Sequence, residues 1–222
     1  MPHDRPPLSQ RLIAEGLGSF FLFATVIGSG IMAEKLADGN VAVALLGNTM
    51  ATAAILFVLI TMLGPISGAH MNPAVSLVIA ARHKLTWRDM LAYVLVQIGC
   101  GILGAWAAHL MFDLPILQTS LKARSGIGQW AGEFIATFGL VLTILGTERH
   151  RPQWIPVSVA LYITAAYWFT SSTSFANPAI TIARSLTNSF AGIAPANVPM
   201  FIVAQLAGAT VAAQVAAKLF PE

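Results

Sequence analysis

The sequence predicts an all-α membrane protein with six transmembrane helices and two re-entrant half-helices, arranged as an inverted repeat. Three observations predict this fold. Of the 222 residues, 56% are hydrophobic and only 9% are charged, whereas a soluble domain usually carries about a quarter charged residues. The triplet Asn-Pro-Ala occurs twice, at residues 72–74 and 177–179. The two copies lie about half a chain apart, and each is flanked by strongly apolar stretches.

The charge content argues against nucleic acid binding, and the cysteine content excludes an internal disulfide. Twelve basic and nine acidic residues give a net charge of +3, which is too small and too dispersed to indicate nucleic acid binding. The single cysteine, Cys100, excludes an internal disulfide, and its apolar surroundings favour a buried small residue over a reactive thiol. Membrane lipid is therefore the predicted surrounding of this chain.

In the first half, a polar tail (residues 1–10) precedes apolar spans expected at residues 11–33, 41–63 and 89–112. Each span is close to the roughly 20 residues that a transmembrane helix needs. Between the second and third spans, the segment from Gly64 to Met71 is expected to break the helix. A short helix is expected from Asn72 to about Ala81, and at about 1.5 Å per residue it cannot cross a membrane.

The second half follows the same plan. After a connector at residues 113–125, spans are expected at 126–147, 154–170 and 200–219. A polar break at 171–176 precedes a second short helix at 177–185. Three spans and one half-span make an odd number of crossings, so the second copy enters the membrane from the opposite side. We expect one domain over residues 1–222, with repeats at approximately 9–115 and 126–220.

Paired polar residues within the spans support the duplication. Glu15 corresponds to Glu133, and Gln97 corresponds to Gln205. An ionisable residue inside a span is a functional candidate. Two interpretations are open: a proton relay, or a structural acceptor for the loops beside the half-helices, which we favour. Glycines of the spans are expected to allow close helix packing; they are Gly16, Gly18, Gly99, Gly101, Gly104 and Gly208.

Lysine and arginine predict the orientation. Eight of the twelve lie on one predicted side and three on the other, while Arg184 belongs to the second half-helix. The more basic side is expected to face the cytoplasm, which places both termini inside. The basic-side residues are Arg5, Arg11, Arg82, Lys84, Arg88, Arg149, Arg151 and Lys218.

Each triplet can begin a helix inside the membrane. Proline suits the first helical position, and asparagine suits the cap, where its side chain can also offer N–H donors. Two helix N-termini entering from opposite sides would bring two positive dipole ends together near the midplane. A cation meets a barrier there, whereas a neutral solute meets hydrogen-bond donors. The six residues of this predicted pore centre are Asn72, Pro73, Ala74, Asn177, Pro178 and Ala179.

The combination of motifs resembles the aquaporin (major intrinsic protein) family. The resemblance covers nearly the whole chain and includes the segment from Ser67 to Val75, the second triplet and the paired glutamates. It implies six spans with two half-helices, one pore per subunit and a homotetramer. No cofactor, metal or enzymatic activity is expected.

The chain departs from that family after the second triplet. Most members carry an arginine at that position, where this chain has Ile180. The nearest arginine, Arg184, lies one helical turn later on the same face. It either guards the outer mouth or anchors a loop. Near the first triplet, His70 either lines the inner vestibule or forms a loop hydrogen bond.

Family spacing places the remaining filter positions, giving a predicted filter of Thr52, Ala165, Ser174 and Ile180, with Ala166 as the alternative to Ala165. None of these is aromatic or charged, so the resemblance implies a wide filter of low polarity. Water and larger neutral solutes such as glycerol, arsenite and methylated arsenicals would pass. The residues around the second triplet resemble a bacterial branch associated with arsenic-resistance gene clusters, which implies a bacterial inner membrane.

Two other functions are kept open. A strict water channel is one, but it would normally combine a bulky aromatic residue, a histidine and the arginine in its filter. A secondary active transporter is the other, because inverted repeats and broken helices also build transporters. Saturable uptake driven by an ion gradient would indicate the transporter.

Overall fold

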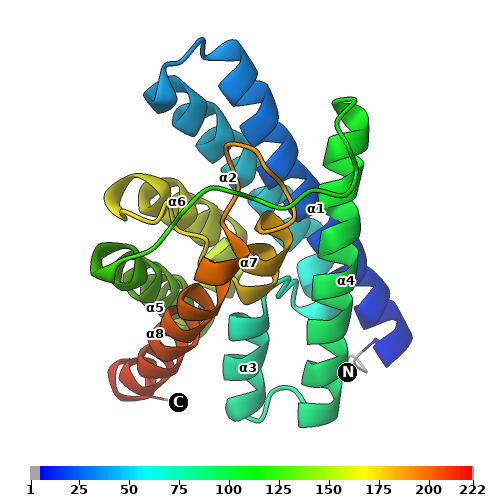
Figure 1. Cartoon of the computed structure of the whole chain (residues 1–222). Helices are drawn as coiled ribbons and strands as arrows, with labels where there is room; N and C mark the ends of the chain where they lie inside the picture. Colours follow the sequence, from blue (N-terminus) through cyan, green and yellow to red (C-terminus); the bar gives the residue numbers. More distant parts are fainter. Residues whose placement is uncertain (1–5, 222) are drawn as a thin grey trace.

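The computed structural model describes residues 6–221, so Arg5 of the predicted basic side lies outside the described residues. Within this range the chain forms eight α-helices and two short 3-10 helices, and no β-strand (Figure 1). In chain order they are α1 (Leu8–Leu36), α2 (Val41–Ser67), α3 (Pro73–Ala81), α4 (Trp87–Met111), α5 (Ile127–His150), η1 (Pro152–Trp154), α6 (Ile155–Phe169), α7 (Pro178–Arg184), η2 (Pro195–Asn197) and α8 (Val198–Leu219).

Five helical segments in the described range are long and apolar enough to cross a membrane: α1, α2, α4, α5, and η2 joined to α8. The sixth predicted span, at 154–170, is the 15-residue helix α6, which is shorter than the roughly 20 residues that a full crossing requires. Pro152 begins η1, which directly precedes α6, and Pro156 lies in the first turn of α6. Thr170 takes an extended conformation and ends α6.

The end of α2 differs from the expectation. The helix continues through Gly64 and Pro65 to Ser67, four residues beyond the predicted end at residue 63. Gly68 is the residue in the left-handed conformation, with φ of 88°, so it supplies the C-terminal cap. Pro65 lies in the last turn, where a missing N–H removes only one intrahelical hydrogen bond.

Both predicted half-helices are present, and their asparagines are caps rather than helical residues. Helix α3 begins at Pro73 with Asn72 as its N-cap, and α7 begins at Pro178 with Asn177 as its N-cap. The two short helices contact one another inside the bundle. Figure 1 shows α3 and α7 between the longer helices.

Glycines bring two helix pairs into backbone contact. A Cβ on Gly104 of α4 would lie 2.2 Å from the carbonyl oxygen of Phe20 in α1. A Cβ on Gly208 of α8 would lie 2.3 Å from the carbonyl oxygen of Phe134 in α5. The corresponding helices of the two halves therefore pack in the same manner. The packing role expected for Gly99 is wrong, because a Cβ there would meet nothing within 4 Å.

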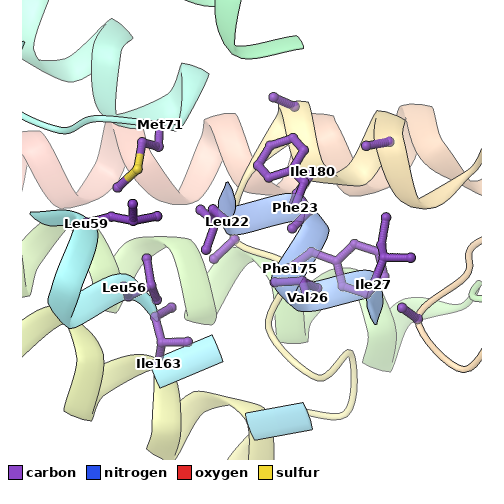
Figure 2. Packing of buried hydrophobic residues seen from close by; sticks show 14 of the residues in the cluster. Leu22, Phe23, Val26, Ile27, Leu56, Leu59, Met71, Ile163, Phe175 and Ile180 are labelled. Carbon is purple, nitrogen blue, oxygen red and sulfur yellow. The ribbon is translucent and has the colours of Figure 1, made fainter. Parts of the chain in front are cut away.

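The start of α1 and the end of α8 lie at the same end of the bundle, while the connector of residues 113–126 crosses the opposite end (Figure 1). An ion pair at the first of these ends, with Lys84 Nζ 2.9 Å from Glu148 Oε1, joins the two halves. Figure 2 shows apolar side chains from several elements packing in the interior, among them Leu22 of α1, Leu56 of α2 and Ile163 of α6.

Candidate functional site

The loops before the two half-helices are joined by reciprocal hydrogen bonds. Asn72 Nδ2 donates to the carbonyl oxygen of Ala176 at 2.8 Å. Asn177 Nδ2 donates to the carbonyl oxygen of Met71 at 2.7 Å. These bonds hold the N-termini of α3 and α7 against each other, as the two triplets predicted.

Each asparagine also caps its own helix. Asn72 Oδ1 accepts a hydrogen bond from the Ala74 N–H at 2.9 Å, and Asn177 Oδ1 accepts from the N–H groups of Ala179 at 3.0 Å and Ile180 at 3.3 Å. The oxygen therefore serves the helix and one amide hydrogen serves the opposite loop. The second amide hydrogen of each side chain has no hydrogen-bond partner among residues 6–221, and both side chains line the central cavity.

Glu15 holds the loop that precedes α3. Its carboxylate accepts hydrogen bonds from the His70 N–H at 2.8 Å and the Met71 N–H at 2.7 Å, and from Ser67 Oγ at 2.7 Å. Gln97 Nε2 donates to the same carboxylate at 2.8 Å. The side chain of Glu15 is fully buried, so these donors replace the water that a charged carboxylate would otherwise require.

Glu133 holds the corresponding loop before α7. It accepts from the N–H groups of Phe175 at 2.8 Å and Ala176 at 2.9 Å, and from Gln205 Nε2 at 2.6 Å. Thr173, Ser174 and Ala176 in this loop have positive φ, a conformation that costs energy for non-glycine residues. The buried carboxylate fixes this strained backbone.

Two further residues complete these networks and were missed from the sequence. Gln97 Nε2 also donates to Ser76 Oγ at 3.0 Å, and Gln205 Nε2 donates to Thr181 Oγ1 at 2.9 Å. Ser76 and Thr181 each lie four residues after the asparagine of their triplet. This equal spacing from the two asparagines is the feature of the sequence that could have indicated both residues.

A cavity of about 690 Å³ passes the asparagine pair. One end lies among the start of α1, the end of α5 and the start of α6, with Arg11, Lys84, Glu148 and Gln153 in its wall. His70 lines it near the first triplet, and His70 Nδ1 lies 3.0 Å from Ser76 Oγ, so both roles considered for this histidine fit its position. The other end is formed by Thr52, Tyr167, Ser174, Phe175, Ile180 and Arg184.

Three of the four predicted filter residues line this far end: Thr52, Ser174 and Ile180. Ala165 does not, because it is exposed on the outer surface of α6, and the alternative, Ala166, is buried away from the lining. The wall is formed by Ile163 and Tyr167, which lie four residues apart on one helical face. A count along the chain could not fix which face of α6 turns inwards.

Tyr167 changes the character of the predicted filter. Its hydroxyl group donates to Thr52 Oγ1 at 3.3 Å, so an aromatic, hydrogen-bonding side chain lies where an alanine was expected. Arg184 also lines the cavity and is only 2% exposed. The expectation of a filter without aromatic or charged side chains is therefore wrong for this end of the cavity.

Comparison with known proteins agrees with this geometry. A sequence model described as "Major intrinsic protein" matches residues 3–171, which is more than half of the chain. The chain belongs to the major intrinsic protein family. It is 56% identical over 205 residues to the aquaglyceroporin AqpS of Rhizobium meliloti (strain 1021), covering 92% of this chain and 88% of the relative.

Two proteins of lower sequence identity also match over most of their length. Identity to the aquaporin AqpM of Methanothermobacter thermautotrophicus is 31% over 240 residues, covering 93% of this chain and 95% of AqpM. The solved structure of the aquaglyceroporin from Plasmodium falciparum matches with a TM-score of 0.74 and 20% identity, covering 97% of this chain and 98% of that one. At that identity the structural match establishes the shared fold.

Proposed function

We propose that the chain is a passive membrane channel for water and for larger uncharged solutes that carry hydroxyl groups. The observation that carries this proposal is the cavity. It passes Asn72 and Asn177, which are joined by reciprocal hydrogen bonds, and its far end has both polar and apolar side chains in its wall. The channel character follows from membership of the major intrinsic protein family. The aquaglyceroporin name of the relative at 56% identity supports solutes larger than water.

The far end of the cavity suits an amphipathic neutral solute. Thr52, Tyr167 and Ser174 supply hydroxyl groups, and Ile163 and Ile180 supply apolar surface. The Ser174 hydroxyl oxygen is buried and has no hydrogen-bond partner in the described part of the chain. A solute with hydroxyl groups on one side and hydrogen or methyl groups on the other matches both surfaces. Glycerol and the methylated arsenicals have both kinds of surface, and the uncharged hydroxide form of arsenite has the hydroxyl groups.

Ion exclusion follows from the half-helices. The N-termini of α3 and α7 converge on the asparagine pair, where the macrodipoles and the free amide hydrogens repel cations and bind neutral oxygens. Secondary active transport would require large rearrangements of the repeats, whereas here the half-helices are joined directly by two buried hydrogen bonds. Passive conduction is the better interpretation.

The assembly and location belong to the same proposal. We place the chain in a bacterial inner membrane as a homotetramer with a pore in each subunit and both termini in the cytoplasm. The two halves are an inverted repeat over approximately 9–115 and 126–220. Their matching glutamate, glutamine and glycine contacts support this duplication.

Stopped-flow swelling of proteoliposomes tests the function. Vesicles with the purified protein are expected to swell faster than empty vesicles in gradients of water, glycerol and uncharged arsenite, without saturation and without dependence on an ion gradient. The substitution Ile180→Arg is expected to reduce glycerol flux several-fold by filling the wall with a longer cationic side chain. Equal or greater glycerol flux in that variant contradicts the filter assignment, and flux that needs an ion gradient identifies a transporter.

A further inference from the structure

Arg184 places a guanidinium group inside the cavity. The residue lies at the C-terminal end of α7, one turn after Ile180, yet its side chain contacts the ring of Phe175, which precedes the helix in the chain. Side chains on an α-helix point back towards its N-terminus. The Arg184 side chain therefore runs back along α7 towards its N-terminus, so that the guanidinium lies near Ile180 and Ser174.

The position of this guanidinium is fixed by its surroundings. Its Cζ atom lies 3.3 Å from the centroid of the Phe175 ring, so the two planar groups stack. Its Nε donates a hydrogen bond to the carbonyl oxygen of Ala191. Phe175 is itself held by Glu133 through its backbone N–H. The ring on which the guanidinium stacks is therefore held by the same hydrogen bonds that fix the loop before α7.

The remaining donors of Arg184 are available to a ligand. An arginine carries five N–H donors, and beyond the bond to Ala191 the described residues supply no acceptor for the other four. The residue is only 2% exposed and lines the cavity, so molecules inside the cavity are the partners within reach of these donors. Ser174, whose buried hydroxyl oxygen has no hydrogen-bond partner in the described part of the chain, lines the same part of the cavity.

A second arginine, Arg124, contacts the same ring from outside the cavity lining, so it is a control for the loss of a guanidinium at this ring. The Cζ atom of Arg124 lies 5.0 Å from the same Phe175 ring, and its guanidinium donates to the carbonyl oxygens of Gly192 at 2.9 Å and Ser172 at 3.2 Å. Arg124 does not belong to the cavity lining. Both arginines thus hold the loop through a backbone carbonyl oxygen, and only Arg184 also lines the solute path.

We propose that Arg184 is the specificity-determining residue of the pore, with its guanidinium on Phe175 donating hydrogen bonds to the oxygens of passing neutral solutes and repelling cations. This inference rests on the proposed channel function and deepens it. The pore therefore has a cationic constriction although Ile180 follows its second Asn-Pro-Ala triplet. The ligand class is a small uncharged molecule with oxygen acceptors, and protonated amines and hydrated protons are excluded.

Arg184→Gln tests this role against Arg124→Gln, which removes a guanidinium from the same ring outside the lining. Proton permeability is measured in proteoliposomes with an internal pH-sensitive dye under a potassium diffusion potential, and glycerol permeability by stopped-flow swelling. Because like charges repel strongly in a site shielded from water, Arg184→Gln is expected to raise proton permeability about tenfold or more. Arg124→Gln is expected to keep the wild-type value, and Arg184→Lys is expected to restore exclusion of protons while changing glycerol flux several-fold.

Wild-type proton permeability in a folded Arg184→Gln variant that still conducts glycerol overturns the role of Arg184 and leaves the channel function intact. An equal rise in both glutamine variants also overturns it, because loosening of the loop would then explain the leak. If Arg184→Gln does not fold, Arg184→Lys decides alone, and wild-type glycerol flux in that variant counts against a guanidinium-specific contact. A wild-type protein that conducts no neutral solute refutes the proposed function and this inference together.

Discussion

Asn72 and Asn177 each donate a side-chain hydrogen bond to the carbonyl group of the residue that precedes the other, Ala176 and Met71 respectively. The same two side chains cap the helices that follow them. One residue type in two equivalent positions thus provides both the start of each half-helix and the contact between them.

Asn177→Ala is expected to destabilise the protein by about 2 kcal/mol, because a cap and a buried cross-link are lost together. Asn40→Ala is the matched control, since Asn40 caps α2 at the surface through Ala42 and Val43 and makes no cross-link. Thermal unfolding in detergent compares the two variants. A decrease in Tm for Asn177→Ala no larger than that for Asn40→Ala would show that the cross-link contributes little.

Glu15→Gln is expected to destabilise the protein by roughly 3 kcal/mol, because an amide NH2 group would face the N–H donors that the carboxylate now accepts. Glu148→Gln is the control, since its ion pair with Lys84 lies partly exposed and such pairs contribute little. Unfolding of both variants in denaturant gives the comparison. Undiminished stability of Glu15→Gln, with a changed pH dependence of proton flux, would support the proton-relay interpretation instead.

Gly104→Ala is expected to disrupt the α1–α4 contact, because the added Cβ would lie 2.2 Å from the Phe20 carbonyl oxygen, far inside van der Waals contact. Gly208→Ala should behave alike in the second half, where the corresponding distance is 2.3 Å. Gly99→Ala, with nothing within 4 Å, is expected to be neutral or slightly stabilising. Yield of folded protein and Tm measure the effect, and similar values for all three variants would contradict the packing assignment.

Lys122 links stability to pH. Partial burial lowers the pKa of its ammonium group to about 8, and the charges of Arg124 and Arg184 act in the same direction. An unfolded lysine keeps a pKa of about 10.4, so between these values the unfolded chain binds more protons than the folded one. Stability contributed by this residue should therefore rise with pH through that window and level off below about 8, where both states bind the proton.

The measurement is the Tm at pH 7 and pH 9 for wild type, Lys122→Met and the lysine control Lys35→Met. Lys122→Met should show a smaller increase in Tm over this range than wild type, and Lys35→Met should follow wild type. The same increase in all three proteins would assign the pH dependence to other groups.

The sequence by itself determined the elements and their order. Long apolar segments are stable in a membrane only as helices, because every backbone N–H and C=O group must then be satisfied within the segment. A proline after an asparagine begins a helix at a defined residue, so Asn72 and Asn177 could be placed at the starts of half-helices. Their repetition with Glu15 and Glu133 indicated two equivalent halves.

Tertiary structure decided which side chains face the cavity. Ala165 and Tyr167 are two residues apart on α6, and only the rotation of that short helix against α2 places Tyr167 beside Thr52. Arg184 lies beyond the expected filter in the chain, yet its guanidinium stacks on Phe175 and so lies in the cavity wall. Spacing along a chain fixes the position of a residue on its own helix, whereas its distance from a solute depends on how that helix packs against its neighbours.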